Sequence, residues 1–189
     1  MTRLEELEYE KMDHAQKALH DEILSGPRSR IGGPMNGWFR NPELGSLLQK
    51  VGAYCRYHTS LESKLSELAI IVVARAWNQT IEWHAHQPLA LKAGLNPEIA
   101  NSIENRKLPN FDDEREEVVY QVAHEITETR GLSDNTYDHA LNTLGEKTLF
   151  ELTAIIGYYT SIAIQMNCFD VKIKEDAIPE IYLVREHTQ

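Results

Sequence analysis

The stretch "LSELAIIVVARAWNQTIEWHAHQPLALKAGL", residues 65–95, is apolar enough to form two buried helices. It nevertheless contains two glutamates and two histidines, Glu67, Glu82, His84 and His86, among its titratable side chains. Apolar residues recur at helical spacing here and along the rest of the chain, and strand-like alternation is nearly absent. We therefore predict an all-α fold with a helix hairpin at its core. Because burying an unpaired charge costs free energy, the four titratable groups need an explanation.

Gly, Pro and capping residues divide the chain into seven or eight predicted helices. The predicted ranges are 8–24, 42–57, 61–78, 80–93, 97–103, 112–129, 135–144 and 146–167. The segment 26–45 contains five of the ten glycines and three of the seven prolines, so we predict a long irregular loop that borders a site. We expect a first helix within residues 1–25, one domain over 26–175, and a tail over 176–189 that extends towards a neighbouring subunit.

Composition limits the classes of function. A chain of 189 residues with 42% hydrophobic content can bury one core. Its formal charge of -10 and pI near 5.3 argue against binding to nucleic acid or to an anionic membrane surface. No uninterrupted apolar run reaches a membrane span of about 20 residues. Cys55 and Cys168 lie far apart in apolar helical patterns, and no leader precedes them. We expect a soluble, reduced, cytoplasmic protein with a small-molecule partner.

Two segments resemble each other. "KLSELAIIV", residues 64–72, and "TLFELTAIIG", residues 148–157, share a Leu-x-Glu-Leu pattern that is followed by small or apolar residues. This similarity suggests a duplicated helix, although chance similarity between leucine-rich helices is a fair alternative. If the helix is duplicated, Glu67 and Glu151 occupy matching positions, and only Glu67 is followed by a helix that carries Glu and His.

Glu82 and His86 are four residues apart and therefore share one helix face, while His84 points roughly to the other side. In a structural interpretation, Glu82 and His86 form an i to i+4 hydrogen-bonded pair and Glu67 braces the hairpin. In a functional interpretation, the three side chains meet in an apolar cavity. Burial raises a carboxyl pKa and a nearby imidazole opposes that shift, so such a cluster can hold and move one proton near neutral pH.

The stretch 66–95 is similar to the signature helix pair of the carboxymuconolactone decarboxylase family, whose superfamily includes the alkylhydroperoxidase D-like (AhpD-like) proteins. "GPRSRIGGPMNGWFRNPELG", "YCRYHTSLESKLSEL" and "LGEKTLFELTAIIGYYTSIAIQMNCFDV" resemble the corresponding loop, helix junction and last helix of that family. The resemblance covers residues 26–171. It implies an all-helical fold that assembles into homo-trimers or hexamers, with the active pocket near subunit contacts.

The peroxidase branch of the superfamily uses a glutamate, a Cys-x-x-Cys pair and a histidine. The resemblance maps the glutamate and the histidine onto Glu67 and His86, but Gln79 and Glu82 stand at the cysteine positions. Disulfide chemistry needs a thiolate and a resolving thiol, so the usual peroxidase mechanism is disfavoured. An alkylhydroperoxidase or peroxiredoxin-type activity would need a non-standard thiol, for which Cys55, beside Arg56, is the candidate.

The decarboxylase branch fits better, and it implies a cofactor-free carboxy-lyase that acts on a small carboxylated lactone or related ring acid. A protonated His86 oriented by Glu82 would supply the acid, and Glu67 would hold or relay the proton. A cation should balance the substrate carboxylate. The candidates for that cation are Arg28, Arg30, Arg40 and Arg56. Aromatic side chains could wall a pocket for a flat ring or simply pack in the core: Trp38, Trp77 and Trp83.

Two further alternatives concern the same cluster. His84 and His86 are two residues apart and cannot both face one ion from a regular helix, so we expect no metal, although one His with two Glu could bind a divalent ion. The cluster could also belong to a non-catalytic ligand-binding oligomer, in which it only braces a subunit contact.

Overall fold

The structure is a computed structural model that describes residues 2–27 and 29–171. Within these ranges the chain folds into nine α-helices and a short 3-10 turn, and the all-α prediction is confirmed. The helices are α1 (His14–Ser25), α2 (Met35–Trp38), α3 (Pro42–Tyr57), α4 (Ser63–Ala76), α5 (Thr80–Lys92), α6 (Pro97–Glu104), α7 (Glu114–Thr129), α8 (Asp134–Leu144) and α9 (Glu146–Cys168). The expected tail over 176–189 and Arg28 lie outside the described residues.

Most predicted helices agree with the observed ones to within two residues, but the N-terminal region differs. The first helix begins at His14 rather than at residue 8, because Asp13 caps it in a reciprocal capping box with Gln16. Tyr9–Lys11 forms a separate 3-10 turn. The segment 26–45 is not entirely irregular either. It contains α2, where Trp38 is only 3% exposed, so burial orders this turn despite the surrounding glycines.

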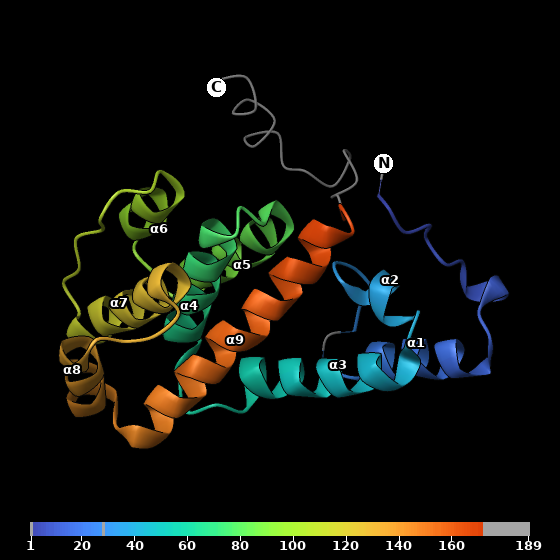
Figure 1. Ribbon diagram of the computed structural model, residues 1–189, viewed down its shortest axis with the longest axis horizontal. Helices are drawn as coiled ribbons and strands as arrows, with labels where there is room; N and C mark the ends of the chain where they lie inside the picture. Colours follow the sequence, from blue (N-terminus) through green and yellow to red (C-terminus); the bar gives the residue numbers. More distant parts are fainter. Residues whose placement is uncertain (1, 28, 172–189) are drawn as a thin grey trace.

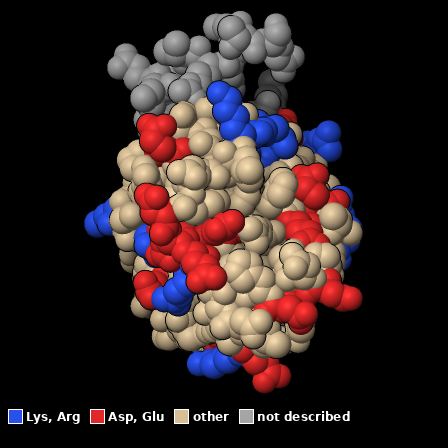
Figure 2. Space-filling view, turned by 90° about the vertical axis from the view of Figure 1, so that its left-hand side faces the viewer, with Lys and Arg blue, Asp and Glu red and all other residues tan. Residues whose placement is uncertain are grey.

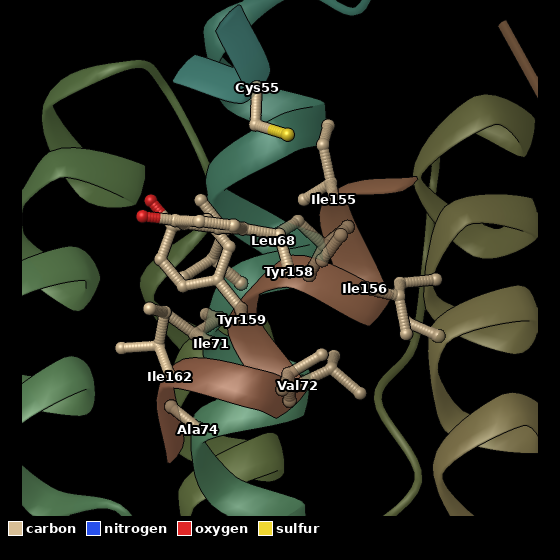
Figure 3. Packing of buried hydrophobic residues seen from close by; sticks show 14 of the residues in the cluster. Cys55, Leu68, Ile71, Val72, Ala74, Ile155, Ile156, Tyr158, Tyr159 and Ile162 are labelled. Atoms are coloured by element: carbon tan, nitrogen blue, oxygen red, sulfur yellow. The ribbon is translucent and has the colours of Figure 1, made fainter. Parts of the chain in front are cut away.

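α4 is the central helix of the fold. Its residues from Leu65 to Ala74 are all buried, and it packs against α5, α7 and α9 (Figure 1). Figure 3 shows Leu68, Ile71 and Val72 of α4 in one cluster with Ile155 of α9. Burying one such aliphatic side chain contributes about 1.5–3 kcal/mol, so this contact is a main source of stability.

α9 has the length and apolarity of a membrane-crossing helix, although no segment of the chain was expected to have them. Its contacts explain that composition without a membrane. α9 packs against α3, α4, α7 and α8, and 56% of its most apolar window is buried inside the molecule. It also buries the carboxylate of Glu151. α9 is thus a core helix.

The N-terminal helices are joined by a close approach at Gly45, in the first turns of α3. A Cβ at this position would lie 2.6 Å from Leu19 Cδ2 and 2.8 Å from Trp38 Cβ. No side chain fits at that distance, so glycine lets α3 contact α1 and α2 directly. The segment 26–45 is thereby held against α3 and the C-terminal part of α9.

Candidate active site

The hairpin of α4 and α5 positions two of the three side chains on which the functional interpretation rests. Asn78 has a left-handed φ of 50°, which turns the chain sharply after α4. The Gln79 side chain then accepts a hydrogen bond from Ile81 N and caps α5. The two helices lie side by side, so Glu67 of α4 and His86 of α5 meet across the hairpin.

One carboxylate oxygen of Glu67 contacts the imidazole of His86, and the other faces the guanidinium group of Arg56. His86 Nδ1 lies 2.6 Å from Glu67 Oε2, and Arg56 Nη2 lies 3.7 Å from Glu67 Oε1. The three side chains are at most 15% exposed. Because a carboxylate accepts hydrogen bonds, Nδ1 donates, and proton exchange between the imidazole and a bound molecule would use Nε2.

The imidazole of His86 is also held by an aromatic contact from α9. The rings of His86 and Tyr159 lie edge to face, with centroids 5.0 Å apart. Tyr158 packs against Tyr159 in the same geometry at 5.2 Å. Figure 3 shows both tyrosines beside Leu68 and Ile71 of α4. Three helices therefore fix the orientation of the imidazole: α4 through Glu67, α5 through its backbone and α9 through Tyr159.

Glu82 lies one helical turn before His86 and is 4% exposed. Within the described residues neither oxygen of its carboxyl group has a hydrogen-bond partner. Burial raises the pKa of Glu82 to about 8, so the group is mostly protonated at neutral pH. The expected hydrogen bond between Glu82 and His86 is absent from the described residues, because the imidazole reaches across the hairpin to Glu67 instead.

Two of the four residues predicted to bind a substrate, Arg40 and Trp38, have partners elsewhere. Arg40 donates to the backbone oxygen of Glu5, and Arg30 is exposed. Trp38 Nε1 donates to Gln165 Oε1 at 3.1 Å. Trp83 is 5% exposed, and its indole N–H has no hydrogen-bond partner among the described residues.

A hollow of about 260 Å³ lies beside Trp38, between the segment 26–45, α3 and the end of α9. The loop was expected to border a hollow next to His86, but this hollow is lined at the α9 end by Gln165 and Met166. His86 contacts α9 at Tyr159, seven residues earlier and about 10 Å away along the helix axis. The loop and the Glu67–His86 pair thus contact different parts of α9.

Two residues of the cluster, Arg56 and Tyr159, are difficult to predict from the sequence. Arg56 was one of four candidate arginines, and only the contact between α3 and α4 distinguishes it. Tyr159 was not singled out, because a tyrosine pair in an apolar helix reads as core packing. Cys55 precedes Arg56 but is 2% exposed within the apolar cluster, next to Ile155 in Figure 3. A thiol in such surroundings is generally unreactive.

Within the described part of the chain, no group of three His, Cys, Asp or Glu side chains has the arrangement of a metal site. The ionisable groups that do meet are a guanidinium, a carboxylate and an imidazole, with a protonated carboxyl group one turn away. Such an array can supply positive charge and a proton to a bound anion.

Comparison with known proteins supports this fold. No protein-family model matches the sequence. No curated protein matches it either. The structure is similar to a crystal structure of a cysteine-to-alanine variant of the debrominase Bmp8 in complex with 2,3,4-tribromopyrrole, with a TM-score of 0.68 and 12% identity. The match covers 92% of this chain and 91% of that one. The chain therefore has an AhpD-like all-helical fold, as the sequence resemblance implied.

Proposed function

We propose that the protein is a cofactor-free lyase that decarboxylates a small carboxylated lactone or a related ring acid by proton transfer. The observation that carries this proposal is the buried array Arg56–Glu67–His86, with protonated Glu82 one turn away. Catalysis of this reaction requires stabilisation of negative charge and one well-placed acid, and the array offers both.

In the proposed reaction the bond between the ring carbon and the carboxylate breaks, and its electron pair moves into the conjugated carbonyl system. Carbon dioxide leaves, and an enolate-like anion forms. The positive charge of Arg56 and the Nε2–H of a protonated His86, whose Nδ1–H is held by Glu67, stabilise that anion. The Glu82 carboxyl group delivers its proton to carbon and is reprotonated from solvent before the next turnover.

The fold comparison supports the size and shape of the substrate. The debrominase of similar structure is bound to 2,3,4-tribromopyrrole, which is a small, flat, substituted ring. We infer that this chain takes a ring of comparable size, with a carboxylate as the group that leaves. Trp83 is a proposed wall for that ring, because it is 5% exposed and its indole N–H has no hydrogen-bond partner among the described residues.

The test is turnover of 4-carboxymuconolactone and related ring acids, measured as release of carbon dioxide. We expect Glu67→Gln, His86→Ala and Glu82→Gln each to reduce turnover by about 100-fold or more. The matched control is Glu151→Gln, which changes an equally buried glutamate outside the array and should retain turnover within about twofold. Unchanged turnover in the His86 variant would contradict the proposal.

We also propose that the chain forms a homo-oligomer, a trimer or hexamer, through α3. Four apolar residues of α3 are at least half exposed and follow the heptad spacing of a helix–helix contact: Leu44, Leu47, Val51 and Tyr54. A second copy would cover this stripe close to Arg56. We expect Leu47→Glu to yield monomers in light scattering coupled to size-exclusion chromatography. A monomeric parent protein at tens of micromolar would contradict the assembly.

A further inference from the structure

A second hollow, of about 190 Å³, lies at the opposite end of α4 from Glu67. Its walls come from the C-terminal end of α4, from the segment after α6 and from α7. Three cationic side chains line it: Arg75, Arg106 and Lys107. We call this hollow the basic cleft. Arg75 lies eight residues after Glu67, or about 12 Å along the α4 axis, so the basic cleft is separate from the candidate active site.

The positive charge of the basic cleft is only partly compensated: Glu104 acts electrostatically on Arg75, and Glu128 lies in the lining. None of its three cations forms an ion pair within the described residues, in a chain whose formal charge is -10. Arg75 and Arg106 both donate to Asn78 Oδ1, the latter at 3.0 Å, so two guanidinium groups converge on one neutral oxygen. Figure 2 shows acidic side chains over much of one face, with one group of basic side chains in its upper part and others near its edges.

Helix capping explains part of this arrangement. Arg75 Nε donates to Glu104 O at 2.7 Å, at the end of α6, and Arg106 Nη2 lies 3.4 Å from Arg75 O, near the end of α4. Cations are favourable at helix C-termini, where the helix dipole is negative. Capping does not explain the third cation, Lys107. Capping also does not require the cations to lie close together. Their proximity is unfavourable, because burial and, next in size, the positive charge of Arg106 lower the pKa of Arg75.

The backbone gives an independent indication at Arg106. This residue has a φ of 54°, in the left-handed region, and follows α6 at the position where helices usually place glycine. Lys107 N donates to Ser102 O at 2.8 Å, which closes the turn. A residue with a side chain is less stable in this conformation than glycine. An arginine nevertheless stands at this position, and it lines the basic cleft.

One wall of the basic cleft is aromatic. Tyr120 and His124, one turn apart on α7, stack with an interplanar angle of 7° and a centroid separation of 5.4 Å. Both line the cleft, as does one carboxylate, Glu128. From the three cations and this flat wall we propose that the basic cleft binds the oxyanion group, carboxylate or phosphate, of a small molecule. Guanidinium groups suit both anions through paired N–H donors.

Calorimetric titration at pH 7 with two probes, inorganic phosphate and benzoate, tests this proposal. We expect Arg106→Gly to weaken binding of the preferred probe by about tenfold, the value for one charge-assisted hydrogen bond. The matched control is Arg130→Gly. Arg130 also has a left-handed φ, of 73°, after α7, so its replacement relieves the same backbone cost without touching the cleft. Binding to that control should change by less than about twofold.

Two further variants separate binding from capping. Glu128→Gln removes the one carboxylate of the lining and should tighten binding by about twofold, whereas a purely structural role of the arginines predicts no change. If the ring of a ligand packs against Tyr120, Tyr120→Leu should weaken the binding of benzoate but not that of phosphate. If the cleft recognises a phosphate alone, Tyr120→Leu should leave the binding of both probes unchanged. The proposal is overturned if neither probe binds at about 50 mM, or if Arg106→Gly binds as tightly as Arg130→Gly.

Discussion

Glu67 and Glu151 occupy matching positions in two similar helices and are buried to the same degree, at 7% and 5% exposure. Their partners differ. Glu67 binds an imidazole and faces a guanidinium group. Glu151 accepts hydrogen bonds from Ser60 N at 2.7 Å and from Ser60 Oγ at 2.5 Å. A carboxylate held by a hydroxyl and an amide is a structural brace, whereas one held by an imidazole can take part in proton transfer.

Glu82 completes this comparison because it has no hydrogen bond among the described residues. Burial raises its pKa to about 8. Burial also acts to raise the pKa of Glu151, but the two hydrogen bonds from Ser60, together with the charge of Lys147, outweigh it and bring that pKa below the usual value. Two buried glutamates thus have shifts of opposite sign, and hydrogen bonding to the ionised form decides which sign appears.

The largest expected effect is the pH dependence of stability caused by Glu82. Below pH 4.5 this group is protonated in both the folded and the unfolded state. Between 4.5 and about 8 only the unfolded state loses the proton, so the free energy of unfolding falls as pH rises. At about 1.4 kcal/mol per unit, the loss is about 5 kcal/mol. Denaturant titrations of the parent and of Glu82→Gln at several pH values measure it, and parallel profiles would contradict the raised pKa.

The second-largest effect is expected on stability when Glu151, the structural brace, is replaced. Glu151→Ala removes the acceptor for the N–H and the hydroxyl of Ser60, just before α4. We expect the free energy of unfolding to fall by about 1–3 kcal/mol, the cost of partly buried donors without partners. Glu151→Gln keeps one acceptor oxygen and should lose less. Equal losses in the two variants, measured by urea denaturation, would show that packing rather than hydrogen bonding matters at this position.

The acid side of the stability profile should show the opposite sign for Glu151. Because the pKa of Glu151 is lowered in the folded state, its contribution is fully present above the unfolded value of 4.5 and is lost as pH falls through the folded value. Thermal melts between pH 3 and 6 should therefore show a shallower acid dependence for Glu151→Gln than for the parent. If the parent and Glu151→Gln lose stability identically at acid pH, a group other than Glu151 causes the acid dependence.

The smallest effect is expected at Lys147, whose Nζ lies 3.7 Å from Glu151 Oε1 and whose side chain is 75% exposed. Because Lys147 is exposed and separated from the carboxylate by 3.7 Å, we expect the pair to contribute at most about 0.5 kcal/mol, as i to i+4 helix pairs do. Lys147→Ala should therefore change the urea midpoint very little, and a loss above about 1 kcal/mol would mean that the charge, not the hydrogen bonds, holds Glu151.

Sequence periodicity predicted the helices well, because glycines, prolines and caps mark helix ends locally. It missed α2, whose four residues are ordered by burial of Trp38 and not by their own helix preference. It also placed the start of α1 too early, since the capping box at Asp13 overrides the apolar pattern before it.

The candidate site was predictable only in part. Helical spacing and the family resemblance pointed to Glu67 and His86, and the structure brings these two together. Spacing alone suggested Glu82 as the partner of His86, because residues four apart share a face, whereas the contact across the hairpin depends on how α4 and α5 pack. The basic cleft had no sequence signal, since Arg75 and Arg106 are 31 residues apart and lie in unrelated segments.

α9 has a consequence for engineering this protein. Glu151 near its start anchors the helix junction at Ser60, Tyr159 in its middle supports His86, and Gln165 near its end holds Trp38. These three attachments lie along one 23-residue rod. A substitution that tilts this rod would displace all three together, so redesign of the hollow beside Trp38 cannot be separated from the geometry around the imidazole.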